Sequence, residues 1–134
     1  MNNAITEEAY SQAVSKLIKL AQGDTGGSRV AAQVLLSAFN GEAWQLNIVD
    51  LSVLDKSNYK AALDVIRGRV ELYMEPHTLI ENGDRVFEEL WHRWERYHVE
   101  NRAKPFCSAC SGSGRRWIDD SKEVVCESCE GKGY

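Results

Sequence analysis

The C-terminal 28 residues contain one eight-residue pattern twice, and this repeat limits how that part of the chain can fold. The pattern is C-x-x-C-x-G-x-G, at residues 107–114 and again at residues 126–133. Its four cysteines are the only ones in the chain, and fifteen residues separate the two pairs. This spacing is typical of two knuckles that place four thiolates around one tetrahedral zinc ion. The sequence therefore predicts one Zn²⁺ per chain, bound by Cys107, Cys110, Cys126 and Cys129.

The segment between the two knuckles predicts a β-hairpin. Its sequence indicates a short strand, a polar turn at residues 119–121 and a second strand, which would bring the knuckles side by side. Glycines follow the second cysteine of each knuckle, where the backbone must turn back and a positive φ is tolerated. Because thiolates would fill all four coordination positions, we expect a structural rather than a catalytic zinc.

Two other interpretations of the cysteines are weaker. Disulfides would suit a secreted protein, but the first residues lack the basic and apolar regions of a signal peptide. A redox-active C-x-x-C pair usually accompanies a βαβ pattern, which surrounds neither pair here. Redox switching by zinc release remains a secondary alternative. No apolar stretch is long enough to span a bilayer, so we expect no membrane partner. Because the cysteines must stay reduced to bind zinc, we expect a cytoplasmic protein.

The repeated pattern resembles the DnaJ-type cysteine-rich zinc-finger domain. That family carries four copies and builds two zinc sites, whereas this chain has two copies, enough for one site. The resemblance implies that the four cysteines are zinc ligands and that Gly112, Gly114, Gly131 and Gly133 occupy the family's glycine positions. The His-Pro-Asp signature of the J-domain is absent from the sequence, so the resemblance does not extend to a co-chaperone.

Two further resemblances imply a phage or prophage origin. A finger with a single site is similar to the zinc-binding segment of lambdoid phage Q antitermination proteins. Residues 20–32, followed by Leu35-Leu36 and Asn40-Gly41, resemble a small helical domain of uncharacterised phage and prophage proteins. That domain has no activity to carry over, but it implies that the protein acts in the cytoplasm of a bacterial host.

Charge is unevenly distributed along a chain whose formal net charge is −4. Residues 1–84 contain seven basic and eleven acidic residues, whereas residues 93–116 contain six basic and two acidic ones. The acidic N-terminal part argues against unaided nucleic-acid binding, which usually needs a strong basic surface. The basic segment leads into the first knuckle and predicts a partner-binding surface. Its residues are Arg93, Arg96, Arg102, Lys104, Arg115, Arg116 and Trp117.

Helical periodicity predicts a mainly α fold, a small bundle of about four helices with a C-terminal zinc-binding β-hairpin. The first helix should begin after Thr6 and end at Gly23, and the second should have Ser28 as its N-cap and stop at Asn40-Gly41. The third should span about residues 57–73 and the fourth about residues 82–100. Residues 42–56 fit either a strand or a helical turn. We expect two domains, a helical bundle over residues 1–101 and the finger over residues 102–134.

Helical spacing also predicts which side chains face the core. On the third helix the apolar face should comprise Tyr59, Ala62, Leu63, Ile66 and Val70. On the fourth helix the aromatic stripe that includes Trp91 and Trp94 could stack on nucleic-acid bases, but its helical spacing favours a core position. Arg93 and Arg96 should then stay exposed, and Phe106 and Trp117 should pack the finger against the end of this helix.

No pattern in the sequence indicates an enzyme. The glycine-rich segment 23–28 lacks the lysine and the preceding strand of a phosphate-binding loop, so it predicts a turn between two helices. The sequence therefore predicts a small non-enzymatic zinc-binding adaptor or regulatory protein that binds a host protein complex through its helical body and finger. The alternatives are an antiterminator-like regulator that binds nucleic acid and a chaperone-like or redox-sensing zinc protein.

Overall fold

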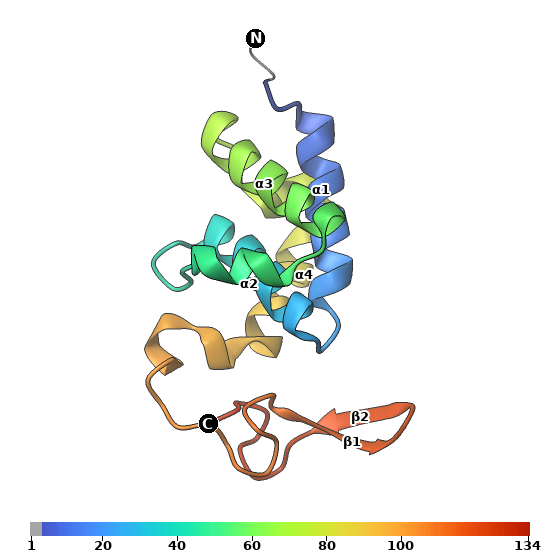
Figure 1. Ribbon diagram of the computed structural model, residues 1–134, viewed down its shortest axis with the longest axis vertical. Coiled ribbons are helices and arrows are strands. Elements are labelled where there is room, and N and C mark those ends of the chain that lie inside the picture. Colours follow the sequence, from blue (N-terminus) through green and yellow to red (C-terminus); the bar gives the residue numbers. More distant parts are fainter. Residues whose placement is uncertain (1–3) are drawn as a thin grey trace.

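The computed structural model describes residues 4–134 and has two parts, a helical body and a small finger below it (Figure 1). The described residues form four α-helices: α1 (Glu7–Ala21), α2 (Gly26–Phe39), α3 (Lys56–Glu71) and α4 (Gly83–Arg93). The 3₁₀ helices are η1 (Ile48–Val53), η2 (Pro76–Leu79), η3 (Glu95–Tyr97) and η4 (Val99–Asn101). The finger contains β1 (Arg115–Asp119) and β2 (Lys122–Val125). The predicted fold class, mainly α with a C-terminal hairpin, is confirmed.

Side-chain caps fix where the first helices begin. Thr6 accepts a hydrogen bond from the backbone N–H of Ala9 through its Oγ1, at 3.0 Å, as expected for the N-cap of α1. The N-cap of α2 is Thr25, whose Oγ1 accepts from the N–H of Ser28 at 3.0 Å. Ser28 is therefore inside the first turn, and its predicted role as the cap is wrong. Either residue can cap a helix, and the local sequence does not decide between them.

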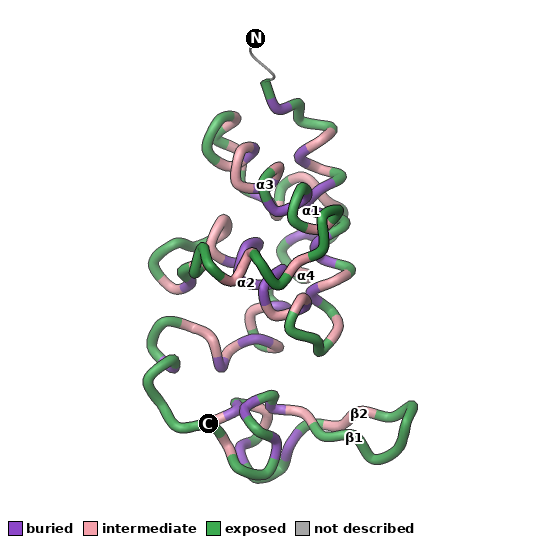
Figure 2. The backbone as a smooth tube through the Cα atoms, in the orientation of Figure 1, coloured by how far each residue is buried: buried purple, intermediate pink, exposed green. Residues whose placement is uncertain are grey.

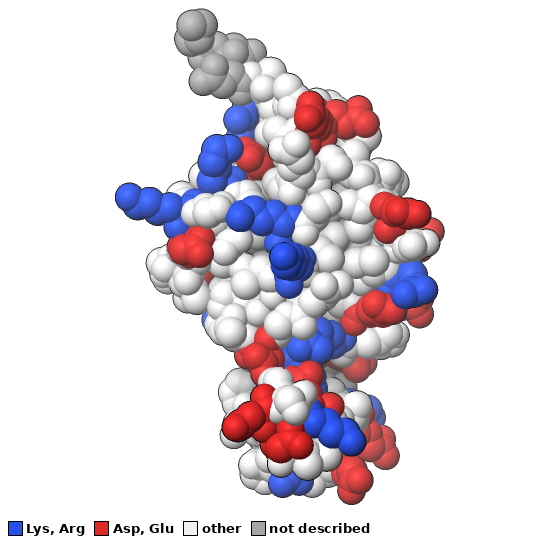
Figure 3. All heavy atoms as spheres, turned by 90° about the vertical axis from the view of Figure 1, so that its right-hand side faces the viewer, with Lys and Arg blue, Asp and Glu red and all other residues white. Residues whose placement is uncertain are grey.

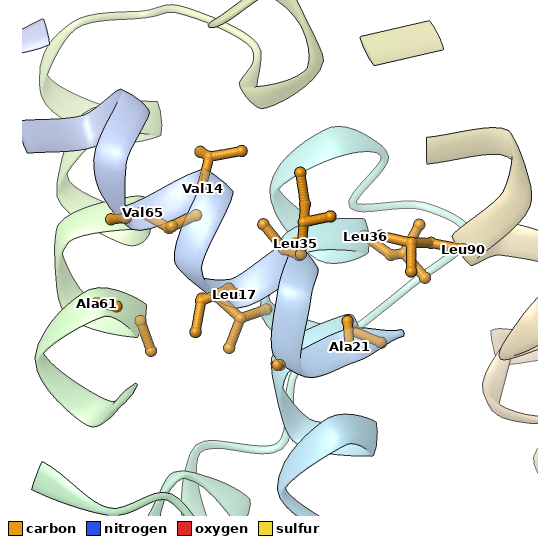
Figure 4. Packing of buried hydrophobic residues seen from close by; sticks show 14 of the residues in the cluster. Val14, Leu17, Ala21, Leu35, Leu36, Ala61, Val65 and Leu90 are labelled. Carbon is orange, nitrogen blue, oxygen red and sulfur yellow. The ribbon is translucent and has the colours of Figure 1, made fainter. Parts of the chain in front are cut away.

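The core lies where α1 packs against both α2 and α3 (Figures 2 and 4). In Figure 2 the buried residues follow the inner faces of these helices, and the outer turns are exposed. Val14, Leu17 and Ala21 of α1 point toward residues of α2, α3 and α4, and all three are buried. Burial of these aliphatic side chains is the main source of the body's stability.

The buried face of α3 differs from the predicted one. Tyr59, Leu63 and Val70 were expected in the core, but they are 43%, 37% and 64% exposed. The buried residues of α3 are instead small or short: Ala61, Ala62, Val65 and Gly68. The aromatic ring of Tyr10 explains the difference, because a Cβ at Gly68 would lie only 2.1 Å from the Cγ of Tyr10. Close packing of α1 on α3 therefore favours small residues over the larger apolar ones.

Residues 42–56 form no strand. The chain leaves α2, buries the side chain of Trp44 completely, and then forms η1. Asn47 caps this 3₁₀ helix by accepting a hydrogen bond from the N–H of Val49, at 3.1 Å. The alternative of a helical turn is thus closer to the structure than that of a strand.

α4 ends at Arg93, seven residues before the predicted end at Glu100. Trp94, with φ −110° and ψ 18°, leaves the helical conformation and is followed by η3 and η4. Its indole Nε1–H donates to the carbonyl of Ala21 at 2.8 Å, so a contact with the end of α1 holds the ring where the helix stops. Phe87 and Trp94 are buried, as the core interpretation of the aromatic stripe predicted.

β1 and β2 form the expected antiparallel hairpin, with Arg115 opposite Val125 and Trp117 opposite Glu123. The register shifts between Trp117 and Asp119, next to the turn. Asp119 stabilises this turn by accepting a hydrogen bond from the N–H of Ser121 at 2.8 Å. The hairpin projects sideways from the knuckles (Figure 1), and most of its residues are exposed. Over residues 4–134, no helix has the length and apolar character needed to cross a bilayer.

Candidate metal centre

The four cysteines of the finger lie together, with all four Sγ atoms within 4.8 Å of one another. The Sγ atoms of Cys107 and Cys126 are 4.0 Å apart, and those of Cys110 and Cys129 are 3.7 Å apart. Zn–S bonds of about 2.3 Å in a tetrahedron place the sulfurs about 3.8 Å from one another, so these separations fit a four-thiolate metal site. A disulfide would need about 2.05 Å, and all four cysteines are free thiols.

Each knuckle is closed by the same hydrogen bond, from the N–H of its last glycine to the Sγ of its second cysteine. The N–H of Gly114 donates to Cys110 Sγ at 3.2 Å, and the N–H of Gly133 donates to Cys129 Sγ at 3.1 Å. Two further bonds connect the knuckles. The N–H of Cys126 donates to the carbonyl of Gly114 at 2.9 Å, and the N–H of Cys107 donates to that of Gly133 at 2.8 Å. The two copies of the repeat therefore hold each other in place around the sulfurs.

The glycines are required by backbone conformation and by space. Gly112 and Gly114 have φ angles of +88° and +75°, and Gly131 and Gly133 have +83° and +86°. A Cβ at Gly114 would lie 2.3 Å from the carbonyl oxygen of Gly131. These positions match those predicted for the backbone reversals, and they explain why the repeat contains glycine there.

The local environment gives the sulfurs different affinities for protons. Burial raises the pKa of Cys110, but backbone N–H groups of Gly114 and Gly112 and the neighbouring thiols outweigh it and lower that pKa to about 7. Burial and the neighbouring sulfurs raise the pKa of Cys129 to about 11, although the N–H of Gly133 opposes them. One thiolate at this site thus makes the next harder to form, because like charges repel. Four thiolates in so small a space require a cation, which is what a metal site supplies.

An arginine ladder, formed by Arg93 and Arg115 with Glu123, fastens the finger to the helical body. Arg115 Nη1 donates to the carbonyl of Arg93 at 2.9 Å, and Arg93 Nη2 donates to the carbonyl of Gly23 at 2.8 Å. The carboxylate of Glu123 lies 3.6 Å from Arg93 Nη2 and 3.5 Å from Arg115 Nε. Burial, followed by the charge of Arg93, lowers the pKa of Arg115 from its usual range. Sequence reasoning missed Glu123 and Gly23, because no local pattern links them.

Three other residues of the predicted partner surface also bond within the chain. The expectation that Arg96 stays exposed is wrong: it is 6% exposed, donates to the carbonyls of Asn101 and Lys104, and lies 4.2 Å from the ring centre of Phe106. Arg102 donates to the side chain of Gln33 at 2.9 Å and to the carbonyl of Gln45. The Lys104 ammonium lies 4.3 Å from the ring centre of Tyr134.

Arg116 and Trp117 are the exposed members of that predicted surface on the hairpin, and Arg102 and Lys104 are also exposed despite their contacts. Arg116 is exposed, and Trp117 is 56% exposed, although its Nε1–H donates to Asp24 at 3.0 Å. Phe106 is 57% exposed. The predicted contact of the finger with the end of α4 exists, but Arg115 makes its hydrogen bond to Arg93, whereas Trp117 bonds Asp24 in the turn between α1 and α2. Figure 3 shows that acidic and basic side chains mix on this face of the finger rather than forming one basic surface.

The glycine-rich segment 23–28 is the predicted turn between two helices. Thr25 caps α2, and the carbonyl of Gly23 accepts both hydrogen bonds from Arg93. The segment thus supplies the carbonyl group to which Arg93 of the arginine ladder is bonded.

Together, the body and the cysteine cluster define a class of protein, a small helical domain with a four-cysteine finger whose sulfurs are placed as in a metal site. The chain belongs to a family of unknown function, DUF7673, whose sequence profile matches residues 11–95. The match covers most of the helical body and ends before the first cysteine of the finger. No curated protein and no solved structure matches the chain.

Proposed function

We propose that this protein is a zinc-binding adaptor, in which the finger is a folded recognition element held against the helical body. The observation that carries the proposal is the cluster of four Sγ atoms, whose separations of 3.7 and 4.0 Å fit a tetrahedral thiolate site. Zinc is the preferred metal because it takes four thiolates without geometric strain and has no redox chemistry. Cys107, Cys110, Cys126 and Cys129 would hold it.

The bound zinc would supply a cross-link between the knuckles and no reactive position. A tetrahedral site filled by four protein ligands leaves no place for water or substrate. The adaptor is therefore non-enzymatic. Its role is to fix the hairpin in one orientation relative to the body, with the arginine ladder as the second attachment.

The hairpin is the recognition surface in this proposal. Trp117, Ile118 and Val125 are each more than half exposed, and Arg116 lies beside them. Five of the six basic residues proposed from sequence for partner binding make intramolecular contacts, which weakens the case for a nucleic-acid surface. The favoured partner is a host protein complex. The proposal also includes a phage or prophage origin, which is supported by the sequence resemblance alone.

Metal analysis followed by a pull-down from host lysate tests the proposal. The wild-type protein should contain about one zinc per chain, as one four-thiolate site requires, and should retain a discrete protein partner. The double variant Cys126→Ser, Cys129→Ser should lose both. A variant with an intact site but an altered hairpin, Arg116→Ala with Trp117→Ala, should keep the zinc and lose the partner.

Three outcomes would count against the adaptor. If the cysteine variant keeps the same partner, the helical body binds alone and the zinc is only structural. If the wild type retains nucleic acid and no protein, the antiterminator-like alternative replaces it. If the purified protein binds no zinc, the metal-site proposal fails.

A further inference from the structure

A cavity of about 220 Å³ lies between α2, the segment that follows α2, and the turns that follow α4. All of its lining residues precede the first cysteine, so it does not include the metal ligands of the finger. Three arginines and a buried glutamine make it rich in hydrogen-bond donors. Its polar lining includes Arg29, Gln33, Asp50, Arg96, Tyr97 and Arg102.

The amide of Gln33 has a donor without an acceptor. Gln33 is 3% exposed, and its Oε1 accepts a hydrogen bond from Arg102 Nη2 at 2.9 Å. A guanidinium group can only donate, so the amide oxygen must face Arg102 and the amide nitrogen must point elsewhere. Over residues 4–134, Nε2 has no hydrogen-bond partner. Since a buried N–H without an acceptor is costly, this side chain indicates a missing acceptor in the cavity.

The guanidinium group of Arg96 is buried and lacks an anion. Arg96 is 6% exposed, and its Nη atoms donate to the carbonyls of Asn101 and Lys104. Its Nε, like Gln33 Nε2, has no hydrogen-bond partner among the described residues. Carbonyl groups satisfy hydrogen bonds but do not neutralise the charge, and buried charges in proteins are normally paired.

The charges that line the cavity do not balance. Asp50 is its only acidic residue, and this carboxylate pairs with Arg29 at 3.1 Å. Within the described part of the chain, Arg96 and Arg102 form no ion pair. The lining therefore has two positive charges without a carboxylate partner, next to two buried N–H donors without an acceptor.

We propose that this cavity binds a phosphate group. The anion would accept hydrogen bonds from Gln33 Nε2 and Arg96 Nε and would pair with the guanidinium group of Arg102. The phosphate may be free or may be the monoester group of a larger molecule, since both present the same oxygens to the donors.

Other occupants of the cavity fit less well. Water could accept from the amide of Gln33, but it would leave the charges of Arg96 and Arg102 unpaired. A carboxylate has two oxygens in one plane, whereas the donors come from α2, from η3 and from the residue after η4. The cavity is also smaller than the roughly 300–1,000 Å³ of pockets that enclose drug-sized molecules, so it suits one compact group.

Titration of the ¹⁵N-labelled protein with inorganic phosphate at constant ionic strength tests the inference by NMR. The side-chain amide signal of Gln33 should shift, because this group donates to the anion. The chain has four glutamines, and a Gln33→Glu variant identifies the signal by its loss. Calorimetric titration then gives the dissociation constant for phosphate in the wild type and in variants.

Gln33→Glu is also the most informative variant for binding. It places a carboxylate next to Arg96 and Arg102 with almost no change of shape, so it supplies within the chain the charge that phosphate would bring. The affinity for phosphate should fall at least about tenfold, while the midpoint of thermal unfolding in phosphate-free buffer should not fall. Gln12→Glu, the matched control, makes the same change of charge at an exposed position of α1 and should leave the affinity unchanged.

O-phosphoserine and acetate complete the test. Both phosphate compounds should bind, and acetate should not. Tighter binding of O-phosphoserine would assign the cavity to a monoester group, and tighter binding of inorganic phosphate would assign it to the free anion.

Three results would overturn the inference. They are a shift of the Gln33 signal by acetate as large as that by phosphate, wild-type affinity for phosphate in folded Gln33→Glu, and no shift with either phosphate compound. These results are separable from failure of the adaptor proposal, because none of them depends on zinc or on a partner from the lysate.

Discussion

At the scale of single residues, Gly114 combines three structural roles. Its N–H binds Cys110 Sγ, its carbonyl accepts from Cys126, and its φ of +75° turns the backbone between them. A side chain at this position would meet the carbonyl of Gly131, from the other copy of the repeat. The geometry of the four-cysteine cluster therefore depends on this glycine as well as on the cysteines.

Gly114→Ala should lower the zinc affinity of the protein by at least tenfold. Strain at a positive φ costs about 1–2 kcal/mol, and the close approach to Gly131 adds to it. Competition with a chromophoric chelator measures the affinity. Gly41→Ala is the matched control, because its Cβ would meet the carbonyl of Ser37 at an ordinary 3.6 Å. Equal affinities for the two variants would show that the backbone at Gly114 has no part in binding.

Single-residue roles differ in how far the sequence predicts them. The four cysteines and their glycines follow from spacing over a few residues, and the structure brings the sulfurs together as expected. The roles of Arg93 and Arg102 do not follow, since their acceptors lie far away in the sequence, on Gly23 for one and on Gln33 and Gln45 for the other. From sequence alone, a run of basic residues predicts a binding surface. Only the fold shows that several of these side chains donate hydrogen bonds to backbone carbonyls of the same chain.

At the scale of elements, the four helices were predictable because apolar periodicity and caps are local signals. The end of α4 and the buried face of α3 were not. Trp94 stops α4 through a hydrogen bond to Ala21, and the ring of Tyr10 selects Gly68 as the contact on α3. Both outcomes depend on packing between segments that are distant in the sequence, and such packing overrides local preference.

The attachment of the hairpin to the body can be tested at two adjacent positions of β1. Arg115→Ala removes the bond to Arg93 and the pair with Glu123, so the finger should reorient more freely and its ¹⁵N relaxation should become distinct from that of the body. Arg116→Ala changes an exposed neighbour and should leave the relaxation unchanged. The arginine ladder is not the attachment if both variants tumble as the wild type does.

At the scale of the whole molecule, the body and the finger have separate sources of stability. The body has a hydrophobic core, whereas the cluster of buried residues in the finger consists of cysteines. Structural zinc contributes about 10–16 kcal/mol to small domains, which is much of their folding free energy. This difference agrees with the predicted boundary between residues 101 and 102, which remains a prediction.

Removal of zinc should therefore unfold the finger and spare the body. With a strong chelator, the far-ultraviolet circular dichroism should keep most of its helical signal, and a protease should cleave within residues 102–134 while residues 4–101 resist. Calcium-saturated chelator is the control. Cooperative loss of the helical signal would mean that the two parts fold as one unit.

The two copies of the repeat in the finger have the same backbone but different contacts with the helical body. Their backbones are equivalent position by position, with Ser111 and Glu130 sharing a φ of +56°. Yet the first copy faces the body, since Ser111, Gly112 and Ser113 line a cavity shared with Arg93 and Arg115. The equivalent residues 108, 109 and 111 of the first copy and 127, 128 and 130 of the second are all exposed, but no residue of the second copy lines that cavity. Residues 111–113 should therefore vary little among related proteins, because they must fit the helical body. The exposed side chains of the second copy can change without disturbing the four cysteines.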